Sequence, residues 1–152
     1  MRNVRTSVER WPLAEPFRIS RGIKTVAEVV TVEVSEGATS GRGECVPYLR
    51  YGETAENVLE QINVVKGALA TGATRAGLAD LLPPGAARNA IDCAMWDLEA
   101  ASSGKSVEET LGRPLLPMLT ALTVSLDAPA KMAAASAALN GAELIEVKVV
   151  PL

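Results

Sequence analysis

Residues 120–150 read TALTVSLDAPAKMAAASAALNGAELIEVKVV and contain an extended segment, a helical segment and a second extended segment. The pattern predicts a strand over 120–126, a helix over 128–139 that Asp127 can cap, and a strand over 143–150. A strand, a helix and a strand in this order form a βαβ unit, whose strands are parallel and whose crossover is right-handed.

The last strand carries two charged residues on one face. Side chains alternate along a strand, so Glu146 and Lys148 share a face, and Ile145 and Val147 share the other. If the apolar face packs on the helix, the charged face points away from it. In a barrel that direction is the interior, where an unpaired charge is costly. Lys148 is therefore either a functional residue or an edge-strand lysine whose aliphatic chain is buried and whose ammonium is solvated.

The N-terminal third has the alternation of a sheet. Residues 3–10 and 26–34 alternate between apolar and polar side chains, and 35–45 supplies a glycine-containing turn and a third strand. This pattern predicts a three-stranded antiparallel meander with one wet face. Residues 12–25 contain prolines and Gly22, so they are expected to form a long loop.

After an irregular segment at 45–54, the apolar period changes to that of a helix. The first helix is expected to begin after Thr54, the second runs from about Ala86 to Gly104, and a third, short one follows Ser106. Ser106 and Glu109 form a capping box. The expected buried stripes are Val58, Ile62, Val65 and Leu69 on the first helix, and Ala87, Ala90, Ile91, Ala94, Met95, Leu98 and Ala101 on the second.

The fold class expected from these elements is α+β, with one domain over 1–114 and the start of a second over 115–152. A parallel sheet of two strands is not stable by itself. Residues 115–152 are thus interpreted as the incomplete opening of an α/β domain. The alternative is that they add two strands to the same small domain.

Composition excludes several classes of function. The chain has 152 residues, a net charge of −3 and no histidine. Without histidine it cannot form a Ser-His-Asp triad or a zinc-binding HExxH helix, so proton transfer would require a carboxylate, a lysine or a tyrosine. The negative net charge does not favour binding to nucleic acid or to anionic membranes.

The hydropathy pattern of the sequence predicts neither a membrane span nor a signal peptide. No apolar run approaches about 20 residues, and the charged first thirty residues lack an apolar centre, so a cytoplasmic location is the default. Cys45 and Cys93 lie in no CxxC or Cys/His cluster, and both are expected to be buried small apolar residues.

Five strings carry a resemblance to a known family. They are PLAEPFRISRG at 12–22, GRGECVPYLRYGET at 41–54, AARNAIDCAMWDLEA at 86–100, TALTVSLDAP at 120–129 and VKV at 147–149. In this order and spacing they resemble the enolase superfamily, more narrowly its muconate-lactonizing subgroup and the dipeptide epimerases of L-Ala-D/L-Glu within it. The resemblance covers essentially the whole chain.

The resemblance implies an N-terminal capping domain joined to a modified TIM barrel, with the chain ending after the second barrel strand. It also implies Mg²⁺ as cofactor, bound by acidic residues of later strands beyond residue 152, so no metal ligand is expected within this chain.

The implied chemistry is proton abstraction α to a carboxylate, through an enediolate, by two lysines on opposite faces. Lys148 matches the second lysine of the family's K-x-K motif and is the implied catalytic residue. Glu146 stands where the first lysine is expected. A carboxylate there favours the ammonium form of Lys148, whereas a base must lose that proton.

The resemblance also implies substrate-binding residues. Arg21 matches a position that reads the substrate side chain, Tyr51 and Glu53 lie in a loop that closes over the site, and Thr123 and Ser125 end the first barrel strand. Each has an ordinary alternative: a solvated arginine, local turn formation, and plain β-forming residues.

The leading prediction is the N-terminal part of a Mg²⁺-dependent dipeptide epimerase, an isomerase when complete and inactive as this chain alone. The alternatives are a muconate cycloisomerase or o-succinylbenzoate synthase, and a non-catalytic capping-domain fragment or association module. Expected partners are a small dipeptide or carboxylate substrate, and either further copies of the chain or a missing barrel remainder that pairs with the open edge at 143–150.

Overall fold

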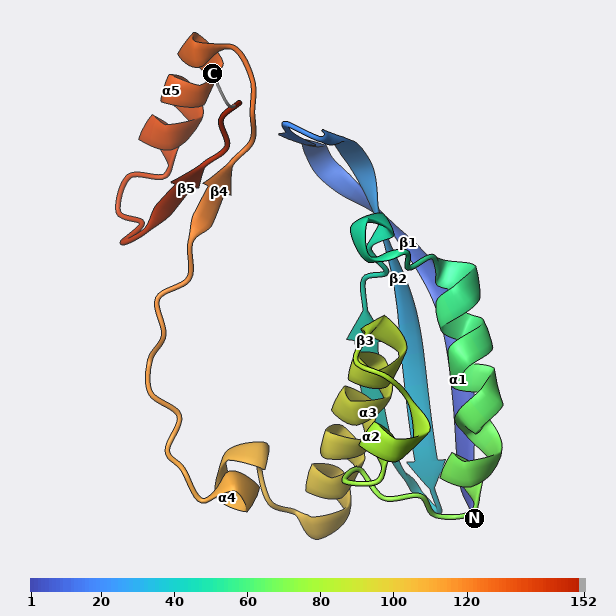
Figure 1. Ribbon diagram of the computed structural model, residues 1–152. Helices are drawn as coiled ribbons and strands as arrows, with labels where there is room; N and C mark the ends of the chain where they lie inside the picture. The colour runs from blue at the N-terminus through green and yellow to red at the C-terminus, as the bar shows by residue number, and fades with distance from the viewer. Residues whose placement is uncertain (151–152) are drawn as a thin grey trace. The chain divides into compact units, whose positions relative to one another are not determined.

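The computed structural model describes residues 1–150 (Figure 1). The chain divides into two compact units. The first comprises residues 1–10 and 28–114, and the second comprises residues 11–27 together with the segment from Leu115 onward. A long hairpin therefore begins and ends in the first unit and has its far part in the second.

The three-stranded sheet consists of β1 (Arg2–Ile19), β2 (Gly22–Glu36) and β3 (Thr39–Cys45), in the order β1-β2-β3. β2 and β3 pair antiparallel from Val30↔Cys45 to Glu36↔Thr39. Ion pairs join β1 to β2 in the same antiparallel sense: Arg2–Glu36, Arg5–Glu33 and Arg10–Glu28. The predicted meander is confirmed.

The long loop expected over 12–25 is wrong, because both strands of the hairpin continue to a two-residue turn between Ile19 and Gly22. Pro12 and Pro16 cannot donate a backbone hydrogen bond, which made the segment read as irregular. They are tolerated because β1 is an edge strand, where alternate N–H groups face no neighbouring strand.

The core of the first unit lies between β2 and two helices, α1 (Ala55–Ala70) and α3 (Ala86–Ser103). Val30, Val32 and Val34 of β2 are fully buried on one face of the sheet. The two helices lie on this face, as Figure 1 shows. Their predicted apolar stripes are buried, except Ala101, which is exposed.

α3 packs against β3 with its backbone unusually close to the strand. A Cβ atom added to Gly41 or Gly43 would come under 3.0 Å from backbone atoms of Leu98, Ala94 or Ala90. Glycine at both strand positions therefore permits this packing, and small helix residues complete it. The Arg42 backbone N–H also donates to Oδ2 of Asp97 on α3 at 2.8 Å.

The helix ends follow their capping residues. Thr54 accepts from Asn57 in a capping box before α1, and Ser106 and Glu109 form another before α4 (Val107–Leu111). α3 ends at Gly104, which has a left-handed φ of 67°. The first unit also contains the 3₁₀ turn η1 (Leu49–Tyr51) and the short helix α2 (Leu78–Leu81).

The second unit contains β4 (Leu122–Val124), α5 (Pro129–Ala138) and β5 (Ile145–Val147). β4 and β5 pair in parallel, from Leu122↔Ile145 to Val124↔Val147. The predicted βαβ unit is confirmed, with shorter strands. Asp127 is not the N-cap of the helix: Ala128 takes that position, and Oδ1 of Asp127 accepts from the Ala128 N–H at 2.7 Å.

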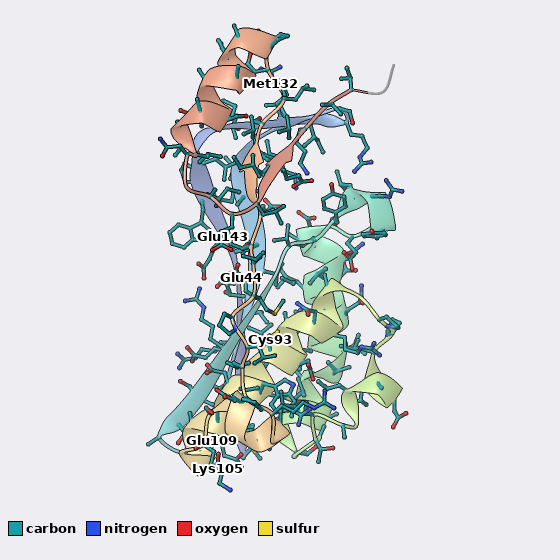
Figure 2. The ribbon with its side chains drawn as sticks, turned by 90° about the vertical axis from the view of Figure 1, so that its left-hand side faces the viewer. Glu44, Cys93, Lys105, Glu109, Met132 and Glu143 are labelled. Atoms are coloured by element: carbon teal, nitrogen blue, oxygen red, sulfur yellow. The ribbon has the colours of Figure 1, made fainter. Side chains whose placement is uncertain are left out.

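The two cysteines differ. Cys45 is buried in the core, as predicted, but Cys93 is exposed on α3 (Figure 2), so the prediction that it is buried is wrong. Within residues 1–150, no helix combines the length and the hydropathy that a membrane span requires.

Candidate functional site

Lys148 lies directly after β5, and its ammonium forms an ion pair with Oε1 of Glu146. The two residues are two positions apart, so both side chains project from the same face. The Lys148 N–H donates to the Val124 carbonyl at 3.1 Å, which continues the parallel ladder by one step. The side chain of Lys148 is 27% exposed, so it is partly covered within the unit.

Thr123 completes this group from the neighbouring strand. It is paired in register with Glu146, and its Oγ1 donates to Oε2 of Glu146 at 3.0 Å. The hydrogen bond from Lys148 lowers the pKa of the Glu146 carboxyl, and the bond from Thr123 lowers this pKa further. Thr123, Glu146 and Lys148 are called the Lys148 cluster below.

Ser125 lies two residues after Thr123 and contacts the hairpin. Its Oγ accepts from the Arg18 N–H at 2.6 Å, and the Leu126 N–H donates to the Arg18 carbonyl at 2.9 Å. Arg21 is exposed at the turn of the same hairpin. The second unit therefore holds four of the six residues predicted for the site.

Tyr51 and Glu53 belong to the first unit. The Glu53 carboxylate accepts from two backbone N–H groups, that of Ala86 at 2.7 Å and that of Tyr48 at 3.2 Å. It thereby caps the start of α3 and fixes the loop before α1. Tyr51 is 76% exposed, and its ring centre lies 5.9 Å from that of Tyr48. Substrate contact by either residue stays a prediction.

Arg18 is the residue that the sequence analysis did not select. Its backbone, not its side chain, makes the contact to Ser125, so no residue-type signal marks it. The one available signal is positional: Pro16, which has no N–H, marks β1 as an edge strand, and Arg18 lies two residues further along it.

The Lys148 cluster combines an amine, which can exchange a proton with a neighbouring group, and a carboxylate that forms an ion pair with it. Residues 1–150 contain no group of three or more cysteine, aspartate or glutamate residues arranged to bind a metal. Mg²⁺ therefore does not fit the residues on this part of the chain.

A family model and a curated relative both match most of this chain. Residues 1–112 match the family model for the mandelate racemase / muconate lactonizing enzyme N-terminal domain. The chain is 45% identical over 151 residues to the L-Ala-D/L-Glu epimerase of Escherichia coli (strain K12), covering 97% of this chain and 47% of that protein. The chain thus spans about half the length of the curated relatives it matches.

Two solved structures are similar to this chain along most of its length. An enolase family member from Agrobacterium tumefaciens with homology to dipeptide epimerases, with bound sodium and L-Ala-L-Glu, has a TM-score of 0.93 and 47% identity, covering 98% of this chain and 46% of that one. A dipeptide epimerase from Cytophaga hutchinsonii, complexed with Mg and D-Ala-L-Val, has a TM-score of 0.82 and 30% identity, covering 96% and 43%.

Proposed function

The chain belongs to the mandelate racemase / muconate lactonizing enzyme family of the enolase superfamily, and from this membership we propose that it supplies the N-terminal half of a dipeptide epimerase. The observation that carries the proposal is its similarity, along almost the whole chain, to an L-Ala-D/L-Glu epimerase and to a structure that binds L-Ala-L-Glu. The N-terminal domain is proposed to cover 1–114, and the start of the barrel domain 115–152.

The proposed reaction is a 1,1-proton transfer at the carbon next to a carboxylate. One group removes the proton, an enediolate forms, and a second group returns a proton to the opposite face. Lys148 is proposed as the acid or base on one face, supported by its place at the end of a barrel-type strand and by its partly covered side chain. The second group is proposed to lie outside the described residues.

Mg²⁺ is proposed as the cofactor of the complete enzyme, because a related dipeptide epimerase was solved with Mg and a dipeptide. A bound divalent cation would neutralise negative charge on the substrate carboxylate. Its ligands are proposed to lie beyond residue 152. Accordingly, the 152-residue chain alone is expected to bind Mg²⁺ weakly and to have no epimerase activity.

The remaining proposals concern setting and assembly. A cytoplasmic location is proposed, as is association with further copies or with the remainder of the barrel. Apolar side chains of the second unit that are exposed within this chain support association: Leu115, Leu116, Met118, Leu119, Val147 and Val149.

The test is incubation of the natural protein, at its full natural length, with L-Ala-L-Glu in D₂O. We expect deuterium at the α-carbon of the glutamate and formation of the epimer, measured by NMR and chiral chromatography. Lys148→Ala should reduce the turnover rate by a factor of about 10³, within the range for loss of an acid-base group. Lys105→Ala, at an exposed lysine, is the control and should not change turnover. Absence of deuterium in the unsubstituted protein would refute the proposal.

A further inference from the structure

The far part of the hairpin, residues 11–27, has an edge that no strand of the sheet covers; this segment is called the arm below. β1 is the edge strand, and alternate N–H groups along it point away from β2. Pro12 and Pro16 lie on this edge strand and have no N–H to leave unpaired. Arg18 follows on the same strand, and its N–H is directed away from β2, to Ser125.

Ser125 satisfies this N–H. Its Oγ accepts from the Arg18 N–H at 2.6 Å and lies 3.2 Å from the Arg18 carbonyl oxygen, to which it can donate. The Leu126 N–H donates to that same carbonyl at 2.9 Å. Both backbone groups of Arg18 are therefore bound to Ser125 and Leu126, which directly follow β4, and Ser125 is 107 positions from Arg18 along the chain.

The strand register places this contact beside Lys148. β4 and β5 pair as Thr123↔Glu146 and Val124↔Val147, and the bond from Lys148 N–H to the Val124 carbonyl continues the ladder. The next position on β4 is Ser125, which neighbours Lys148. Paired residues of neighbouring strands share a face, and Thr123 does contact Glu146 across it. Ser125 thus projects from the same face as the Lys148 cluster.

We propose that Ser125 is a positioning residue that fastens the arm, with Arg21 at its turn, to the end of β4, beside the end of β5 that carries Lys148. Arg21 is only three residues from the fastened backbone of Arg18. An arm that is already held in place loses little conformational entropy when a dipeptide binds at its turn. Ser125 should therefore contribute to substrate affinity and not to the proton transfer itself. This last consequence rests on the proposed function.

The first test measures the fastening by itself, through hydrogen-deuterium exchange of the full-length natural protein. In Ser125→Ala we expect exchange of the Arg18 amide and the arm turn to become at least fivefold faster. Ser125→Thr keeps the hydroxyl and should restore slow exchange. Ser102→Ala, at an exposed serine of α3, should leave the arm unchanged. Unchanged exchange in Ser125→Ala would overturn the proposal, whether or not the protein is an epimerase.

The second test measures the consequence for substrate. For L-Ala-L-Glu we expect KM of Ser125→Ala to rise about tenfold while kcat changes less than threefold, with Ser125→Thr closer to the unsubstituted protein. A tenfold loss of kcat with KM unchanged would overturn the assignment to substrate positioning. If the unsubstituted protein does not epimerise the dipeptide, the proposed function is refuted, and the exchange experiment still decides whether Ser125 fastens the arm.

Discussion

The carboxylate of Glu146 is bound at both oxygens, by the ammonium of Lys148 two residues along the chain and by the hydroxyl of Thr123 on the neighbouring strand. The resemblance described in the sequence analysis implied a lysine in place of Glu146. The pair at this edge of the sheet is therefore one of opposite charges. This pairing neutralises the charge of both side chains on one face of the strand.

The first prediction concerns the pH dependence of stability. The folded-state pKa of Glu146 is lowered from its ordinary value of 4.5, so the carboxylate contributes stability above that value and loses it as pH falls through the lower folded pKa. Glu146→Gln should therefore lower Tm at pH 7, and the difference from the unsubstituted chain should disappear towards pH 3. Thermal unfolding followed by circular dichroism measures this. A difference that grows on acidification would contradict the ion pair.

The second prediction concerns the contact between β3 and α3. Gly43→Ala places a Cβ against the backbone of α3, so we expect a loss of about 2–3 kcal/mol in the free energy of unfolding. Gly67→Ala is the matched control. Gly67 is exposed in the middle of α1, and nothing lies within 4 Å of an added Cβ. This substitution should increase the free energy of unfolding by about 0.5–1 kcal/mol. Urea denaturation separates the two. Equal effects would mean that the packing is looser than described.

The third prediction concerns Glu53. Because its carboxylate accepts from the N–H groups of Ala86 and Tyr48, Glu53→Ala should cost about 1.5–3 kcal/mol, and Glu53→Gln less. Tyr51→Ala in the same loop removes an exposed ring and should stay within about 0.5 kcal/mol. Chemical denaturation provides the measurement. A stability of Glu53→Ala equal to that of the unsubstituted chain would contradict the capping role.

The fourth prediction concerns the two thiols. Burial raises the pKa of Cys45 to about 11, so at pH 8 this thiol is protonated as well as covered. Cys93 is exposed. A thiol-reactive disulfide reagent should therefore modify one cysteine rapidly in the folded protein and the second only after denaturation. Cys93→Ser should abolish the rapid phase. A rapid phase that survives this substitution would show that Cys45 is accessible.

The helices were predictable because their signals are local. The stripe of Val58, Ile62, Val65 and Leu69 repeats at helical spacing, and Thr54 marks the start by capping a nearby amide. The exposure of Cys93 was missed because the small apolar character of a cysteine assigns it to the core, whereas on α3 it lies off the buried stripe that contains Ile91 and Ala94.

The arm and the site were harder to predict because they depend on partners distant in sequence. Pro12 and Pro16 break a strand pattern unless the open edge of β1 is known. Alternation correctly placed Glu146 and Lys148 on one face, but the residue opposite Glu146 depends on the register of two short strands. The contact of Ser125 with Arg18 involves a backbone group, which carries no residue-specific pattern.

The close approach of α3 to β3 also restricts how the sheet can align during folding. Gly41, Gly43 and the small buried Cys45 alternate with Ser40, Arg42 and Glu44, which are exposed. A slip of β3 by one residue would turn Arg42 and Glu44 towards α3, and a slip by two would bring Thr39 or Cys45 to a place that has no room for a Cβ. α3 therefore cannot pack on a β2–β3 hairpin in a shifted register. Packing of α3 stabilises only the native strand pairing.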